Sequence, residues 1–135
     1  MKHIWSILCQ KSIIDQDTNQ ISLINSLEQL NLPKNFFGKT FLMEIHLISY
    51  FFTDKVAQED ELEQTVAILD PQGNKLKELN SPIKMNKNSN KFRLRTIFDG
   101  INLTIPGVYK FTMSVKQGNS RIADSEVPLE IKIQE

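Results

Sequence analysis

The sequence has little of what several classes of protein need. Its 135 residues include one cysteine and two histidines, so within one chain we expect neither a disulfide framework nor a common structural zinc site. Sixteen basic residues balance sixteen acidic ones, which leaves no positive excess to attract a phosphate backbone or an anionic membrane. We therefore predict no cofactor, and we favour neither nucleic acid nor a membrane as the partner.

Long hydrophobic runs are also missing. No uncharged apolar stretch approaches the ~18 residues that span a bilayer. The apolar run near the N-terminus is only about six residues long, shorter than the hydrophobic region of a signal peptide, and polar Gln10 and Lys11 follow at once. We therefore predict a cytoplasmic protein in which Cys9 stays reduced and packs as a small hydrophobic residue.

Alternation with a period of two dominates the chain and predicts β-strands. Apolar side chains occupy every second position over much of five stretches, which are residues 40–52, 62–69, 92–98, 109–115 and 129–133. Such alternation is typical of antiparallel sheets that have one face on a core and the other in water.

Turn-forming residues separate these stretches, as at residues 15–20, 70–74, 106–107 and 117–119. Only residues 26–30 and 56–63 have the pattern of a helical turn or two. Seven to nine short strands at this spacing predict an all-β fold in a single domain, residues 1–135. We expect an antiparallel two-sheet β-sandwich, immunoglobulin-like or Greek-key.

The segment around residues 99–111 has a more specific pattern. Asp99 and Gly100 precede Leu-x-Ile-Pro-Gly-x-Tyr-x-Phe at residues 103–111. This resembles the turn into a late strand of immunoglobulin-like sandwiches, where a tyrosine hydroxyl bonds to the preceding corner. Phe111 holds the position that a cysteine takes in antibody domains, and their strand-C tryptophan is missing. The resemblance is to the sandwich class and not to antibodies.

An ordered series of short motifs covers nearly the whole chain. They begin at Leu8, Asp17, Ala67, Leu103 and Pro128. The series resembles a family of small bacterial β-sandwich proteins known as a domain of unknown function. The resemblance implies the sandwich fold. Because that family carries no established activity, it implies no catalytic residues.

One polar turn has the spacing of a calcium loop. Asp15, Asp17 and Asn19 alternate as the first ligands of such a loop do. However, Gln20 replaces the glycine of the sharp turn, and Ser26 stands where a bidentate glutamate is needed. The interpretation that we favour is a hairpin turn in which Asp and Asn side chains bond to their own backbone.

The sequence has few groups for catalysis. Its only imidazoles are His3 and His46, and its only thiol is Cys9. His46 falls on the same strand face as Glu44, so a Glu–His pair is geometrically open. No nucleophile elbow, glycine-rich phosphate loop or His-Glu-x-x-His motif is present. We predict that the protein is not an enzyme, with an unrecognised hydrolase, whose pocket would join His46 to a nucleophile, as a further alternative.

The face of residues 40–52 that should meet water is too apolar. Four of its seven side chains are large and apolar or aromatic: Leu42, Ile48, Tyr50 and Phe52. A sandwich strand needs only one apolar face, so something must cover the other. The cover is either the chain itself, through Phe36 and Phe37 or residues 56–63, or a protein partner such as a second copy.

These observations favour a non-enzymatic protein-interaction or scaffolding module. Its interface residues would be Leu42, Ile48, Tyr50, Phe52, Phe36 and Phe37. The alternative is a sandwich that binds calcium, an anionic lipid or a sugar through its end loops. Binding would then map to Asp15, Asp17 and the acidic residues within 54–63.

Overall fold

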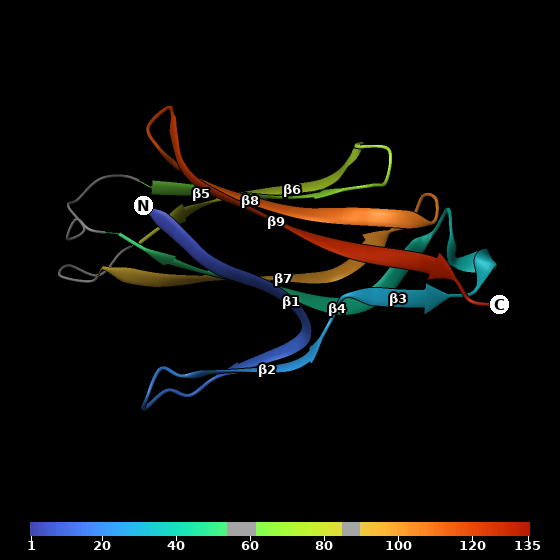
Figure 1. The fold of residues 1–135 in the computed structure, drawn as a ribbon, viewed down its shortest axis with the longest axis horizontal. Helices are drawn as coiled ribbons and strands as arrows, with labels where there is room; N and C mark the ends of the chain where they lie inside the picture. Colours follow the sequence, from blue (N-terminus) through green and yellow to red (C-terminus); the bar gives the residue numbers. More distant parts are fainter. Residues whose placement is uncertain (54–61, 85–89) are drawn as a thin grey trace.

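The computed structural model describes residues 1–53, 62–84 and 90–135, which form an all-β protein (Figure 1). The nine strands among them are β1 (Lys2–Ile14), β2 (Ile21–Ser26), β3 (Gln29–Leu32), β4 (Thr40–Phe52), β5 (Leu62–Leu69), β6 (Lys75–Ile83), β7 (Lys91–Asn102), β8 (Gly107–Gln117) and β9 (Ser120–Ile133). The all-β prediction and the predicted number of strands are confirmed for this part of the chain.

The expected helical turns are not seen where the structure describes those residues. The helix that the described residues contain is a single 3-10 turn, η1 (Lys34–Phe36). The prediction for residues 26–30 is wrong, because β2 ends at Ser26 and β3 begins at Gln29. Residues 56–61 of the other predicted turn lie outside the described residues, while Leu62 and Glu63 belong to β5.

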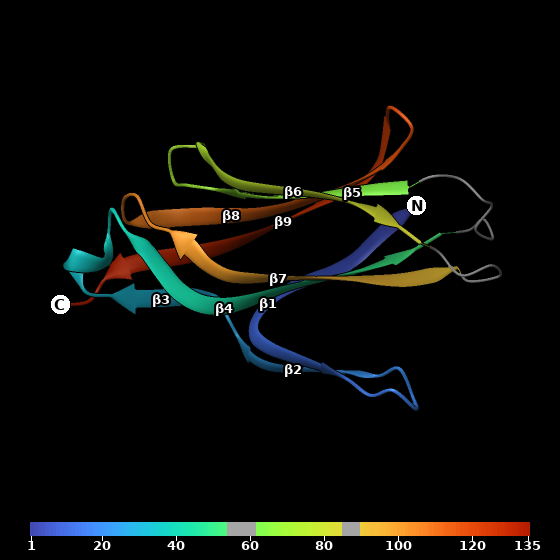
Figure 2. The same cartoon turned by 180° about the vertical axis from the view of Figure 1, so that it is seen from behind.

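The strands form two sheets that face each other (Figures 1 and 2). One has the order β2-β1-β4-β7 and the other the order β3-β9-β8-β5-β6. All the pairs of neighbours are antiparallel except β3 and β9, which run parallel. The prediction of purely antiparallel sheets is therefore wrong at this pair. The chain leaves one sheet at Ser26 and enters the other at Gln29, so no hairpin sets the direction of β3.

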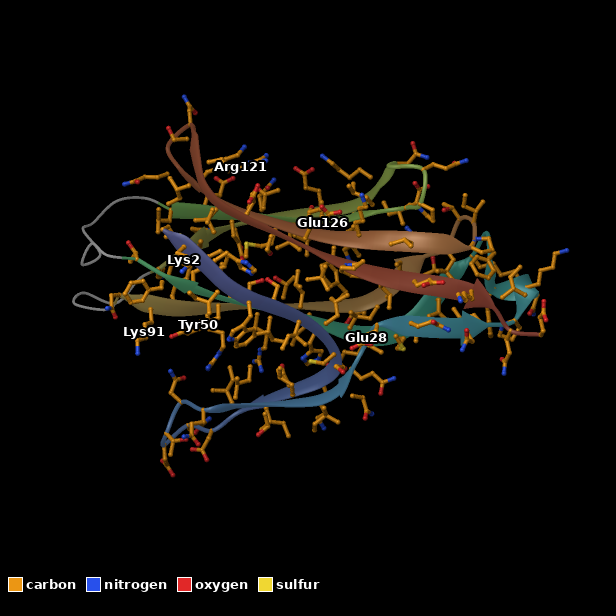
Figure 3. All side chains as sticks on the ribbon, viewed as in Figure 1. Lys2, Glu28, Tyr50, Lys91, Arg121 and Glu126 are labelled. Atoms are coloured by element: carbon orange, nitrogen blue, oxygen red, sulfur yellow. The ribbon has the colours of Figure 1, made fainter. Side chains whose placement is uncertain are left out.

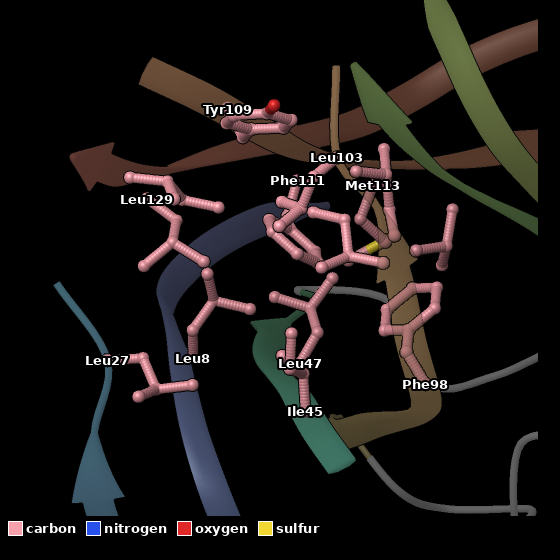
Figure 4. Packing of buried hydrophobic residues seen from close by; sticks show 14 of the residues in the cluster. Leu8, Leu27, Ile45, Leu47, Phe98, Leu103, Tyr109, Phe111, Met113 and Leu129 are labelled. Carbon is pink, nitrogen blue, oxygen red and sulfur yellow. The ribbon is translucent and has the colours of Figure 1, made fainter. Parts of the chain in front are cut away.

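Apolar side chains from both sheets fill the space between them (Figure 4). Alternate residues of β8 all face this core, namely Tyr109, Phe111, Met113 and Val115. Phe111 meets Phe98 of β7 edge to face, with ring centroids 5.6 Å apart. Each large side chain buried in this way contributes about 1.5–3 kcal/mol to the free energy of unfolding. The alternation in the sequence therefore marks the core face of β8.

Strand β1 changes partner along its length. Residues 2–9 pair with β4, whereas residues 9–14 pair with β2. Because β1 bends where the partner changes, the β1–β2 hairpin leaves the plane of its sheet (Figure 1). Hydrogen bonds from Ser12 to His46 of β4 and from Arg93 of β7 to Asn19 place the hairpin against the outer face of the sheet.

Tyr109 makes the corner contact that the sequence predicts. The buried hydroxyl donates to the carbonyl oxygen of Ile105 (2.6 Å) and accepts from the backbone N–H of Thr104 (3.0 Å). Thr104 Oγ1 donates in turn to Asp70 Oδ2 (3.2 Å), which joins this corner to the β5–β6 turn. Burial acts to raise the pKa of Asp70, but hydrogen bonds from Asn74, Gln72 and Thr104 outweigh it and hold the pKa below its ordinary value.

We expect Tyr109→Phe to lower the free energy of unfolding by about 1–2 kcal/mol, because it leaves two backbone groups without their buried partner. Tyr50→Phe is the control, since no hydrogen bond joins the Tyr50 hydroxyl to a described residue, and its effect should stay within about 0.5 kcal/mol. Urea unfolding of the two variants beside the wild type measures both values. Equal effects of the two substitutions would show that the corner contact does not stabilise the fold.

Candidate interaction surface

The outer face of β4 has a covered part and an open part. The covered part lies under the β1–β2 hairpin and includes Ile48 and His46, which are 0% and 3% exposed. At the tip of the hairpin, Asn19 accepts two hydrogen bonds from Arg93 Nη2, at 3.2 Å through its backbone oxygen and at 3.3 Å through Oδ1. The hairpin therefore reaches across β4 as far as β7.

A chain of polar contacts joins the hairpin to the sheet beneath it. Ser12 Oγ lies 2.7 Å from His46 Nδ1, and His46 Nε2 lies 2.5 Å from Glu44 Oε1. A carboxylate only accepts hydrogen bonds, so the N–H group of the ring is at Nε2 and donates to Glu44. In the neutral ring Nδ1 then accepts a hydrogen bond from the Ser12 hydroxyl. Arg95 Nη1 donates to the backbone oxygen and the Oγ of Ser12, at 3.5 and 3.4 Å. We call these four residues the hairpin clasp.

The hairpin clasp contains the parts of a nucleophilic relay. A hydroxyl, an imidazole and a carboxylate follow one another, as in serine hydrolases. The Glu44–His46 pair that the sequence left open is present, and Ser12 is a neighbour that sequence reasoning missed. The sequence signal for Ser12 was weak, because a single serine beside Ile13 and Ile14 does not indicate which residue it will contact.

Burial decides what this arrangement can do. Ser12 is 7% exposed and already accepts a hydrogen bond from the Arg95 guanidinium. An acyl substrate would have to displace the hairpin before its carbonyl carbon came within reach of Oγ. In this conformation the contacts hold the hairpin on the sheet. Moving the hairpin away would leave a buried hydroxyl or imidazole without a partner, which lowers the stability by about 1–3 kcal/mol.

The open part of the outer face lies beyond the hairpin, at the start of β4 and the end of β7. Leu42 is 81% exposed and Ile97 is 44% exposed. Glu44 and Asp99 are exposed on the same two strands. We call Leu42, Glu44, Ile97 and Asp99 the open patch. Gly100 pairs with Leu42, and a Cβ at Gly100 would lie 2.6 Å from the carbonyl oxygen of Phe41, so the backbones here approach too closely for another residue.

The structure does not bring the six predicted interface residues together. Leu42 and Phe36 are exposed, and the Phe36 ring lies against Phe41 with centroids 5.7 Å apart. Phe37 is half-buried and packs against the core. The remaining three lie further along β4: Ile48, Tyr50 and Phe52.

The prediction that Ile48 takes part in an exposed interface is wrong for this fold, because the β1–β2 hairpin covers that part of β4. The cover over Ile48 is thus the β1–β2 hairpin of the same chain, while residues 56–61 of one expected covering segment lie outside the described residues. Tyr50 and Phe52 are half-buried. Tyr50 stacks on Trp5 with ring centroids 5.7 Å apart. It lies close to Lys91 (Figure 3), roughly 26 Å along the strand from Leu42.

The turn at Asp15 has the side-chain to backbone hydrogen bonds expected of a hairpin turn. Asp15 Oδ1 accepts from the backbone N–H of Thr18 (3.0 Å) and of Asp17 (2.8 Å). These bonds hold the pKa of Asp15 below its ordinary value. Within the described ranges, no three Asp, Glu, His or Cys side chains converge. Residues 54–61, which hold most of the acidic stretch proposed for ligand binding, lie outside those ranges, and calcium binding stays a prediction.

No protein-family model and no curated protein matches this sequence. The resemblance to the bacterial domain of unknown function therefore stays a prediction. No helix in the part of the chain that the structure describes is long and apolar enough to cross a membrane. The cytoplasmic location stays a prediction as well.

We expect Ser12 to be unreactive toward a fluorophosphonate probe, because the buried hydroxyl cannot reach the phosphorus atom. Intact-mass spectrometry after incubation should show no adduct, while a serine hydrolase added to the same sample is labelled. An adduct on the wild type that Ser12→Ala abolishes would contradict this expectation and favour the hydrolase alternative.

Proposed function

We propose that the chain is an immunoglobulin-like β-sandwich. In the lettering of immunoglobulin domains, β1, β4 and β7 correspond to strands A, B and E. The strands β5, β6, β8 and β9 correspond to C, C′, F and G. One sheet then contains A-B-E and the other contains G-F-C-C′. This is the strand order of immunoglobulin sandwiches, to which β3 adds a parallel strand beside β9. The hydroxyl contact of Tyr109, near the start of β8, supports the same assignment, because the tyrosine corner belongs to strand F.

We infer that this sandwich is a non-enzymatic protein-interaction module. The observation that carries the inference is the outer edge of β7, which no described strand pairs with, next to the open patch. An unpaired edge offers backbone N–H and C=O groups to an added strand, and neighbouring side chains supply selectivity. Leu42 and Ile97 provide apolar contact beside that edge, while Glu44 and Asp99 provide charge. The burial of Ser12 supports a role without catalysis.

Site-specific photo-cross-linking tests this function in the cells that produce the chain naturally. We expect benzophenone groups placed at Leu42 and at Ile97 to give protein adducts of discrete mass. Ile13 is the matched control, because it is 48% exposed on another strand and lies outside the open patch. Absence of adducts at both patch positions, or the same adducts at all three positions, would rule out an interaction through β7 and the open patch.

A further inference from the structure

Strand β7 is the edge that is best suited to pairing. Among the described residues, the strands that end the two sheets are β2, β3, β6 and β7, with 6, 4, 9 and 12 residues. Short length limits pairing at β2 and β3, and Pro82 interrupts the row of donors on β6. β7 is long and contains no proline, so its outer edge is the least protected of the four.

Two of the charges on β7 lie symmetrically about Ile97. Arg95 and Asp99 stand two residues before and two residues after Ile97, and all three side chains are exposed. Among the described residues, Arg95 bonds to the two oxygens of Ser12, which are uncharged, and Asp99 forms no ion pair. Each of these charges therefore lacks an oppositely charged partner in the described part of its own chain.

We propose that a second copy of this chain is the partner and that the two β7 strands pair antiparallel about a two-fold axis at Ile97. The proposal rests on the proposed function and names its partner. Rotation about this axis places Arg95 of each copy opposite Asp99 of the other, and Ile97 opposite Ile97. Opposite charges facing each other across a strand pair stabilise the pairing. Two four-stranded sheets then join into one continuous sheet of eight strands.

The same charges disfavour two of the neighbouring registers. An axis at Arg95 would place that residue opposite itself, and an axis at Leu94 would place Arg93 opposite Arg95. Like charges directly opposite each other destabilise a strand pair. The axis at Ile97 matches apolar with apolar and cation with anion, so the sequence of β7 complements itself in this register. An isologous interface of this kind closes after two copies.

Sedimentation velocity on the full chain, over a range of concentrations, tests the proposal with charge reversals. The wild type should dimerise. Arg95→Asp and Asp99→Arg should each raise the dissociation constant at least about tenfold, since each places like charges opposite each other. An equimolar mixture of the two variants should dimerise again, because the two aspartates of one variant face the two arginines of the other.

Asp17→Arg is the matched control, since it makes the same change of charge on the hairpin and should leave the dimer intact. Arg95→Asp also loses the contact with Ser12 and could fail to fold for that reason. Asp99→Arg then remains as the test, because Asp99 forms no ion pair with a described residue. A wild type that is monomeric throughout, or a dimer that Asp99→Arg leaves unchanged, would overturn the proposal.

The cross-linking result separates the two failures. A monomeric wild type whose adducts at Leu42 and Ile97 contain a different protein would overturn the second copy as partner and leave the interaction module standing. A monomeric wild type without adducts would overturn both proposals. Adducts of twice the mass of the chain, together with dimerisation restored in the mixture of variants, would support both.

Discussion

The buried hydrogen bond between Ser12 and His46 is the contact on which the outer face of this protein depends. Ile48 makes part of that face apolar, and the β1–β2 hairpin covers it. Apolar contacts alone would let the hairpin shift along the sheet, because they have no preferred direction. The hairpin clasp fixes its position, since His46 and Ser12 are both buried and each needs the other as a hydrogen-bond partner.

The same contact explains where the surface stays open. After Cys9, β1 no longer pairs with β4 and pairs with β2 instead. The resulting hairpin lies over the part of the sheet around His46 and Ile48. It leaves Leu42 and Ile97 uncovered, next to the strand that ends the sheet. An exposed apolar surface beside an open edge is a combination that natural proteins protect unless a partner uses it. The proposed pairing of two β7 strands accounts for both features with one contact.

Local patterns predicted much of the fold. Alternation identified the core face of β8, and the residues around Tyr109 predicted the hydroxyl contact at the corner, because both depend on neighbours in the sequence. The parallel pairing of β3 and the burial of Ile48 were missed, since both depend on strands far away in the chain. For the candidate surface, the sequence named Leu42 as an interface residue and the structure leaves it exposed. Ser12 and the edge of β7 become apparent only when distant strands meet.

Amide hydrogen exchange in Ser12→Ala tests most directly whether the clasp holds the hairpin. We predict that the amides of β2 exchange about tenfold faster than in the wild type, because loss of a buried partner costs on the order of 1–3 kcal/mol in local stability. The amides of β8 should keep their rates, and the exposed Ser22→Ala on the same hairpin should change neither strand. Unchanged exchange in β2, or equal acceleration in β2 and β8, would contradict the account.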